Sequence, residues 1–384
     1  MPVFPKTTKS GSGSAPSTGT EKAARQRGNG RFVTQYQIAR EAGVSRSTVQ
    51  AVLSGSSIQI SDSVKHRVME VAERLNYSPN RFAQIMRSGK SHQIGILHFG
   101  DLYELSERKV VALSEVLAGT PYEPLVLESL WFLRGEDDVA VKMCRNLMES
   151  RVAGIVIVNP GTMFRQEHLD SLLETGIPVV SIEGRDLKGV PDYGQDRVWG
   201  YRQMVTHILE SGRKNIALIA DKASSLNEGA AQALKACPSA RLLGVSWSVP
   251  YPKPVYHKPF NTYNAERGRE AIKEILRWRK RPDAVICSND EVALGALTGC
   301  SEMGVRVPDD IALSGFDGFS SSEFGWVPVS TVLHPIDEIA RGAVDCLLDA
   351  IRSRKPAKPR RVRFRGKLAI RCSCGACTKS ERVQ

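Results

Sequence analysis

The chain has 384 residues, of which 41% are hydrophobic and 24% are charged, and its formal net charge is +12. This length exceeds what one hydrophobic core usually organises, so about two or three domains are expected. No uninterrupted apolar stretch reaches about 18 residues, which excludes a membrane-spanning helix. The first 31 residues lack the apolar run of a secretory signal, and the eight cysteines are scattered, as is typical of reduced thiols in a cytosol.

The positive charge is concentrated at the two ends of the chain. Residues 1–92 carry a net charge of +9 and residues 352–384 a net charge of +11, whereas the residues between them carry −8. A short basic N-terminal module releases counterions when it binds nucleic acid, and the central part needs no polyanionic partner. A solvated basic tail is the simpler alternative.

Three short helices are predicted between residues 33 and 79, after a flexible, basic, Gly- and Ser-rich tail over residues 1–31. The first helix begins at the capping-box sequence Thr34-Gln-Tyr-Gln37 and ends at Gly43. Ser45 caps the second helix and Ser61 the third, each of which has apolar residues at helical spacing.

The first two helices and the glycine-containing turn between them have the arrangement that lays a second helix in the DNA major groove. Near its start, the second helix offers Arg46, Ser47 and Gln50, which can donate hydrogen bonds to base edges or phosphates. Arg46 is the best single candidate for reading a base. A helical hairpin that binds nothing, or that binds a protein, is the alternative that spacing leaves open.

From Ser91 onward, apolar runs alternate with helical stretches, which predicts parallel sheets wound from βα units. A final edge strand is expected at 362–370. The other predicted strands cover residues 94–99, 125–127, 154–158, 178–182, 216–220, 284–287 and 311–316.

The sequence from Ile38 to Gly55, IAREAGVSRSTVQAVLSG, followed by LNYSPNR from Leu75 to Arg81, resembles the DNA-binding headpiece of the lactose/galactose repressor family. The similarity continues through GIPVVSIE (176–183), SNDEVALG (288–295) and VPDDIALSGFD (307–317) and extends to Cys372. It implies a small all-α helix-turn-helix headpiece followed by a two-lobed α/β sensor domain with parallel sheets, like that of periplasmic sugar-binding proteins. The expected parts are a tail (1–31), a DNA-binding domain (32–79), a hinge helix and linker (80–91), an effector and dimerisation domain (92–372) and a C-terminal tail (373–384).

The resemblance also implies a function. It describes a cytoplasmic, nucleoid-associated homodimer that binds a partly palindromic operator in double-stranded DNA, with repression as the default outcome. A small-molecule effector, a sugar or related metabolite, is expected between the two lobes, and no cofactor is expected. No leucine-heptad segment follows Arg371, so a dimer is favoured over a tetramer.

By the resemblance, the hinge helix forms only on DNA and enters the minor groove. The family's usual wedge there is a leucine, and this chain has Met86, an unbranched apolar side chain that can still insert between base steps; ordinary core packing is the alternative. The recognition helix has Gln50-Ala51 where relatives have Ser-Arg or Ser-His, so the operator sequence cannot be transferred. The expected DNA-contacting residues are Thr34, Tyr36, Ser45, Arg46, Ser47, Thr48, Gln50, Asn80, Ala83, Gln84 and Met86.

Effector contacts are expected from residues that end strands, because ligands of open α/β sheets bind at the carboxyl ends of the strands. Asp290 is matched to the family aspartate that accepts hydrogen bonds from effector hydroxyls, although it could simply cap its helix. Glu183 and Arg202 lie at positions that commonly line the pocket, and Phe99 and Tyr103 could stack on an apolar ligand face; salt bridges or caps are the alternatives.

Two departures from the family predict a remodelled pocket with an altered or absent effector. The family often has an aspartate followed by an asparagine where this chain has Asp196-Arg197, and residues 224–234 lack an Arg-rich Gly-Phe motif.

The remaining sequence motifs do not indicate an enzyme or a metal site. Gly89-Lys-Ser91 lacks the glycine and the preceding strand of a phosphate-binding loop, and the histidines form no catalytic constellation, so an enzyme is not expected. Cys372, Cys374 and Cys377 are too few for a structural zinc site, so a disordered reduced tail is favoured and no metal is assigned. A transport solute-binding protein would lack the headpiece, and a sugar-active enzyme would need paired catalytic carboxylates.

Overall fold

The chain forms two compact units, Met1–Gly89 and Lys90–Gln384. The computed structural model describes residues 33–54, 59–78, 91–100, 104–130, 138–161, 164–184, 187–220, 224–246 and 260–376. The expected N-terminal tail and almost all of the expected hinge lie outside these ranges. Within them, no helix is long and apolar enough to cross a membrane.

The first unit contains the three predicted helices, α1 (Gln35–Ala42), α2 (Arg46–Leu53) and α3 (Asp62–Arg74). The capping box at Thr34 is present, and α1 ends at Gly43, whose φ of 64° is the left-handed conformation that favours glycine. The Ser45 hydroxyl accepts a hydrogen bond from the Thr48 N–H at 3.0 Å, as predicted. Ser61 occupies the N-cap position of α3 without forming a side-chain cap.

One apolar stripe from each helix forms the core of this unit. Ile38 of α1, Val49 of α2 and Val68 of α3 are each 0% exposed and pack into one cluster. Full burial of such side chains contributes about 1.5–3 kcal/mol each. The packing fixes which face of α2 is turned to solvent.

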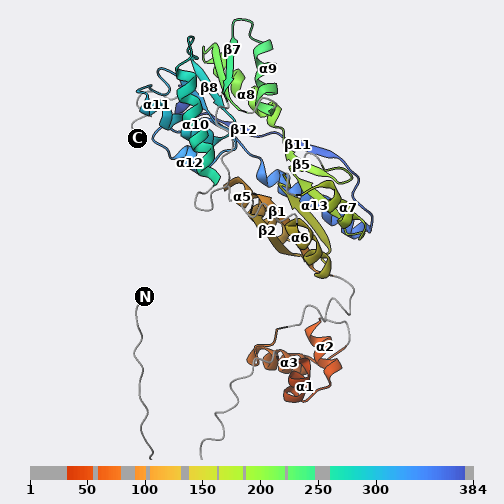
Figure 1. Cartoon of the computed structure of the whole chain (residues 1–384). Helices are drawn as coiled ribbons and strands as arrows, with labels where there is room; N and C mark the ends of the chain where they lie inside the picture. The colour runs from red at the N-terminus through yellow and green to blue at the C-terminus, as the bar shows by residue number, and fades with distance from the viewer. Residues whose placement is uncertain are drawn as a thin grey trace, which may run out of the picture. The chain divides into compact units, whose positions relative to one another are not determined.

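The second unit has two lobes. The N-lobe (residues 91–195 and 335–365) is built on a parallel six-stranded sheet of order β11-β5-β4-β3-β1-β2. Helices α5 and α13 cover one face of the sheet and α6 and α7 the other (Figure 1). The elements are β1 (Gln93–Gly100), α5 (Glu104–Ala118), β2 (Glu123–Leu130), α6 (Asp138–Glu149), β3 (Gly154–Val158), α7 (Gln166–Leu173), β4 (Val179–Ile182), β5 (Asp192–Gln195), α13 (Ile336–Ser353) and β11 (Arg361–Phe364).

The C-lobe (residues 196–334 and 366–376) has a parallel four-stranded sheet of order β7-β6-β8-β9, with α8 and α9 on one face and α10 and α11 on the other. Beside it, β10 and β12 form an antiparallel pair. The elements are α8 (Arg197–Glu210), β6 (Asn215–Ile219), α9 (Ser225–Lys235), β7 (Arg241–Ser246), α10 (Phe260–Leu276), β8 (Ala284–Cys287), α11 (Asp290–Glu302), β9 (Ala312–Ser314), α12 (Ser320–Glu323), β10 (Thr331–Leu333), β12 (Lys367–Ala369) and the 3-10 helix η2 (Cys372–Cys374).

The chain passes between the lobes after β5, after β10 and after β11. The last passage corrects the prediction of one edge strand at 362–370, because β11 pairs with β5 in the N-lobe and β12 pairs with β10 in the C-lobe. The break occurs at Gly366, where a Cβ would lie 2.3 Å from the Leu333 carbonyl oxygen. Only glycine permits this close passage of the backbone.

The C-terminal cysteines also require a correction. Cys372 and Cys374 are 6% and 1% exposed, and the Ser373 hydroxyl between them donates to the Leu313 carbonyl at 2.7 Å and accepts from the Ser330 N–H at 2.8 Å. Residues 373–376 therefore belong to the C-lobe, because their apolar and polar groups complete its core, and the expectation of a tail from residue 373 is wrong for them. Cys377 lies outside the described residues.

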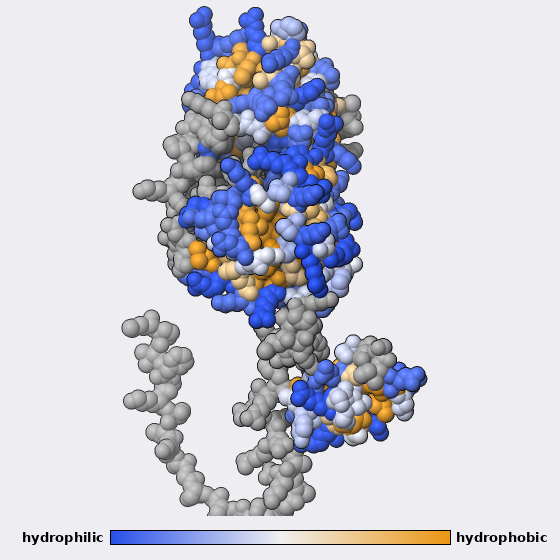
Figure 2. Space-filling view, turned by 90° about the vertical axis from the view of Figure 1, so that its right-hand side faces the viewer, coloured by the Kyte–Doolittle hydropathy of each residue, from blue (hydrophilic) through white to orange (hydrophobic). Residues whose placement is uncertain are grey.

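The surface of the two-lobed unit is mostly hydrophilic on the face that Figure 2 shows, with apolar areas on both lobes. Among the described residues, Phe324 and Trp326 are the most exposed large apolar side chains of this unit, at 83% and 65%. Both lie on the segment between α12 and β10.

Candidate nucleic-acid interface and effector crevice

The amino-terminal half of α2 presents polar side chains to solvent. Arg46, Ser47 and Gln50 are exposed, and Tyr36 on α1 is 70% exposed. Hydrogen bonds to other described residues are absent for the side chains of Arg46, Gln50 and Tyr36. These groups are therefore available to an external partner.

Hydroxyl groups gather at the start of α2. The Ser45 oxygen lies 2.7 Å from the Ser47 oxygen and 2.8 Å from the Thr48 oxygen. Free N–H groups and the helix dipole make such a helix start suited to phosphate. Ser45 and Thr34 are also helix caps, so their expected DNA contacts would add to a structural role. The expected contacts Asn80, Ala83, Gln84 and Met86 lie outside the described residues.

Residues at the carboxyl ends of strands from the two lobes come together where the lobes meet, a region named the crevice from this point. On the N-lobe side Asn159 follows β3 and Glu183 follows β4, and on the C-lobe side Asp317 follows β9. Two contacts join the lobes beside it. The Glu104 carboxylate on α5 accepts from the Ser320 N–H at 2.9 Å, and the Arg108 guanidinium donates to the Gly318 carbonyl at 3.0 Å.

A buried ion pair forms the C-lobe wall of the crevice. Arg197, the first residue of α8, donates to the Asp317 carboxylate at 2.8 Å and to the Tyr201 hydroxyl at 3.0 Å. Its guanidinium also lies 4.5 Å from the centre of the Phe316 ring, a cation–π contact. Burial alone would lower the pKa of Arg197, but Asp317 and Tyr201 raise it on balance, so the guanidinium stays charged.

A second pair lies on the N-lobe side, at the passages between the lobes. The Glu183 carboxylate is 3.3 Å from His334 Nε2 and accepts from the Gln195 N–H at 3.0 Å. Burial alone would raise the pKa of Glu183, but the His334 hydrogen bond and the charge of Lys109 lower it on balance. Burial lowers the pKa of His334. The pair is thus a neutral histidine donating to a carboxylate.

Lys109 supplies a buried positive charge nearby. It is 4% exposed, and its ammonium donates to Asn159 Oδ1 at 3.0 Å. The Asn159 amide in turn donates to the Ser106 hydroxyl at 2.8 Å. Lys109 and Arg197 therefore lie around one crevice with Glu183 and Asp317, and the four side chains supply donors and acceptors able to hydrogen-bond a polyhydroxyl ligand.

Asp290 is placed differently from the expectation. It is 0% exposed, and its carboxylate accepts from the Phe319 N–H at 2.7 Å and the Ser322 hydroxyl at 3.1 Å. Burial raises its pKa to about 7. Asn289 caps α11, so Asp290 braces the turn that follows Asp317 and does not open onto the crevice.

Of the other expected effector residues that the structure describes, one lies in the crevice and two lie outside it. Glu183 lies in the crevice, but Phe99 is 2% exposed and packs on Phe164 with ring centres 5.1 Å apart. Arg202 is exposed on α8, and Tyr103 lies outside the described residues. The sequence analysis missed Arg197 and Asp317 as site residues. The available signals were the Asp196-Arg197 departure and the position of Asp317 directly after a predicted strand.

Comparisons with known proteins agree with this two-part architecture. Residues 34–80 match the model of the "Bacterial regulatory proteins, lacI family", and residues 205–374 match the "Periplasmic binding protein-like domain". The probable HTH-type transcriptional repressor ExuR of Bacillus subtilis (strain 168) is 28% identical over 83% of this chain and 92% of its own length. Catabolite control protein A of Priestia megaterium is 27% identical over 87% and 98%.

Solved structures show the same fold. The Lac repressor dimer bound to operator and the anti-inducer ONPF superposes with a TM-score of 0.73 at 23% identity, covering 90% of this chain and 99% of that one. The transcriptional regulator CelR in complex with cellobiose gives a TM-score of 0.59 at 23% identity, covering 89% and 99%. The chain therefore combines a DNA-binding module that matches the lacI family model with a periplasmic-binding-protein-like sensor, and it is a DNA-binding transcriptional regulator.

Proposed function

We propose that the chain is a homodimeric repressor whose affinity for a partly palindromic operator is set by a small-molecule effector. The observation that carries the proposal is the solvent-facing start of α2, where Arg46, Ser47 and Gln50 stand on a rigid three-helix core. Two such units reach two half-sites about one helical turn apart, which requires a dimer. The protein acts in the cytoplasm on the nucleoid and catalyses no reaction.

The effector is a sugar or a related polar metabolite that enters the crevice between the lobes. We assign its main C-lobe contacts to Arg197 and Asp317, in place of Arg202 and Asp290, because the first pair lines the crevice. Glu183 and Lys109 oppose them from the N-lobe. An effector competes with the internal ion pair, so it must supply both hydrogen-bond donors and acceptors.

Coupling between effector and operator passes through the arrangement of the lobes. An effector that binds one arrangement better than another shifts the population by its differential affinity, and operator affinity changes by the same factor. The segment 80–91 connects the two units, and Met86 is proposed as the minor-groove wedge of a hinge helix. If Met86→Gly changes neither operator affinity nor DNA bend, the wedge assignment fails.

Selection of binding sites from a random duplex library, followed by fluorescence anisotropy, tests the proposal. A partly palindromic consensus bound with at least about 1,000-fold preference over random duplex is expected. Indifference to sequence would contradict the function. Sedimentation of the complex checks that two chains bind each site.

The crevice is tested by calorimetric titration of a panel of neutral, acidic and phosphorylated sugars. Asp317→Asn keeps the shape of the side chain but removes its charge, so effector binding should weaken at least about tenfold while operator binding persists. Arg202→Ala is the matched control and should bind the effector normally. The reverse pattern would restore Arg202 to the site and remove Asp317.

A further inference from the structure

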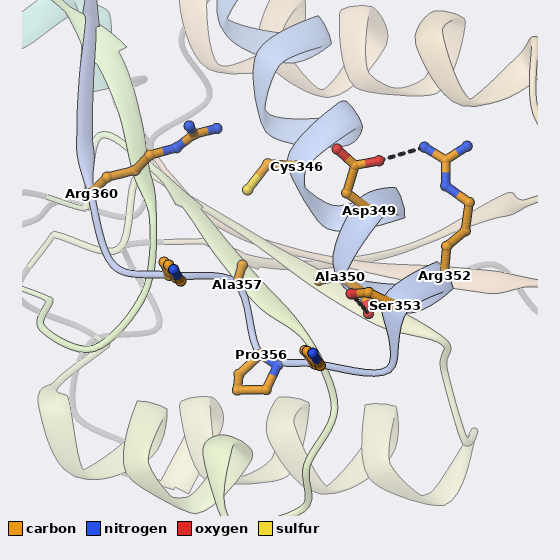
Figure 3. A pocket seen from close by; sticks show the side chains of 10 residues that line it. Cys346, Asp349, Ala350, Arg352, Ser353, Pro356, Ala357 and Arg360 are labelled. Carbon is orange, nitrogen blue, oxygen red and sulfur yellow. Dashed lines mark hydrogen bonds and ion pairs between the residues drawn. The ribbon is translucent and has the colours of Figure 1, made fainter.

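A cavity of about 630 Å³ lies in the N-lobe, between the last turns of α13 and the segment that leads into β11. Its volume falls in the range of about 300–1,000 Å³ that small-molecule sites occupy. Figure 3 shows Cys346 directed from α13 toward the segment that carries Ala357 and Arg360, with Pro356 closing the far side.

The cavity and the effector crevice lie at opposite ends of the strands of the N-lobe sheet. Because β11 is parallel to β5 and pairs Arg361 with Asp192, the cavity adjoins the amino ends of the strands. The crevice residues follow the carboxyl ends. The chain also enters the N-lobe at the amino end of β1, which lies at the same end of this parallel sheet as the cavity.

The wall of the cavity is strongly basic. Residues 352–361 contain six Lys or Arg and no Asp or Glu. Arg352 is paired with Asp349 at 2.6 Å, the interaction drawn in Figure 3. Within the described part of the chain, the ammonium groups of Lys355 and Lys358 have no ion-pair or hydrogen-bond partner, and both residues are exposed.

Arg360 is held in position for a ligand. Its guanidinium donates to the Tyr193 hydroxyl at 2.8 Å and lies 5.8 Å from the centre of the Tyr193 ring. Guanidinium has five N–H donors, so most remain available for an anion. The Cys346 thiol is half-buried at the cavity wall.

Compensation of the α13 dipole does not account for this charge. Cations are favoured near a helix C-terminus, but the effect is confined to the last turn. Lys358 and Arg360 lie beyond that turn, since α13 ends at Ser353.

We infer that this cavity is a second ligand site, separate from the interlobe crevice, that binds a small organic polyanion bearing phosphate. Lys355 and Lys358 supply free charge, Arg360 supplies an oriented fork for two phosphate oxygens, and Cys346 lines the wall. The inference stands independently of which effector the crevice takes.

Calorimetric titration of the full-length protein with inorganic pyrophosphate and glucose 6-phosphate, with glucose as the uncharged control, tests the site. Both anions should bind, glucose should not bind at this site, and Lys355→Ala/Lys358→Ala should weaken anion binding at least about tenfold. Lys235→Ala, which removes an exposed lysine from the last turn of α9, is the matched control and should leave binding unchanged. Asp317→Asn should leave pyrophosphate binding unchanged, because it alters only the crevice.

Cys346 gives an independent readout that locates the ligand. The positive wall should make an anionic methanethiosulfonate reagent label Cys346 about tenfold faster than a cationic one at low salt, and pyrophosphate should slow labelling. Equal labelling rates, or no protection by pyrophosphate, would overturn the proposal. So would a double variant that binds anions normally but loses operator affinity, because that result would assign the surface to DNA.

Discussion

The three-helix unit and the effector crevice hold their polar side chains in opposite ways. Arg46 and Gln50 of α2 are exposed, lie about one helical turn apart, and make no side-chain hydrogen bonds or ion pairs to other described residues. In the crevice, Arg197 and Asp317 are 120 residues apart and pair directly, as do Glu183 and His334 at 151 residues. Substitutions on α2 should therefore change operator affinity without changing the free energy of unfolding. Substitutions in the crevice should also change the free energy of unfolding, and their effects should not be additive.

The largest expected effect is on the buried crevice pair. Arg197→Ala leaves the Asp317 carboxylate buried without its partner, which should lower the free energy of unfolding of the two-lobed unit by about 3 kcal/mol. The double variant Arg197→Ala/Asp317→Ala should be less destabilised than the sum of the single variants. Urea unfolding of all four proteins measures the coupling, and strict additivity would show that the pair is not a unit.

The second prediction concerns α2. Arg46→Ala should cost about 1–3 kcal/mol in operator affinity through a lost base contact, with the unfolding free energy unchanged. Arg67→Ala, an exposed arginine on α3, is the control. Anisotropy titrations at several salt concentrations separate a base contact from a phosphate contact, since only the latter reduces the salt slope. Equal losses for both variants would contradict the special role of Arg46.

The same contrast explains what could be predicted from the sequence. Helix caps, turns and apolar periods are local, so the three helices and most buried strands were predicted. The strands β5, β7 and β10 were not, because they are short or partly polar, and β5 and β10 pair with strands that come later in the chain. The passage at Gly366 likewise depends on a close approach to Leu333.

The crevice was predicted only in part, for a geometric reason. Arg197 and Arg202 are both near the start of α8, but five residues rotate the side chain by about 140° around a helix, so only one of them faces the crevice. Asp290 follows a strand, as a ligand residue should, but the turn from Phe319 to Ser322 folds over it. Which strand-end residue stays open is decided by the neighbouring loop.

A third prediction uses the pH dependence of the Glu183 and His334 pair. The pKa of His334 is lowered in the folded protein. Between the folded and the unfolded pKa values, the histidine is therefore protonated in the unfolded chain and neutral in the folded chain. Stability should fall as pH drops below the unfolded value of about 6.5, by about 1.4 kcal/mol per pH unit until the folded pKa is reached. His334→Gln should remove only the part of this dependence that His334 contributes, because burial also lowers the pKa values of His98 and His207.

Asp290 must be separated from that effect because its sign is opposite. Its pKa is raised to about 7, so its contribution to stability is lost as pH rises from the unfolded value toward 7. The free energy of unfolding is therefore compared between wild type and His334→Gln at each pH. The same comparison is repeated in a protein that also carries Asp290→Asn, which removes the titration of Asp290. If the wild-type and His334→Gln curves stay parallel from pH 7.5 to 5.5, the histidine is not the titrating group.

The smallest expected effect is at the contact between the lobes. Glu104→Ala removes the acceptor for the Ser320 N–H and hydroxyl, a partly exposed contact worth about 0.5–1 kcal/mol. Because this contact lies outside the buried networks, unfolding should barely change while the lobes separate more readily, and effector affinity should fall about two- to fivefold. Glu107→Ala, an exposed carboxylate on the same helix, is the control, and small-angle scattering follows the separation. An unchanged scattering curve with unchanged effector affinity would mean that α5 merely touches the C-lobe, and that the buried pairs alone set the interlobe arrangement.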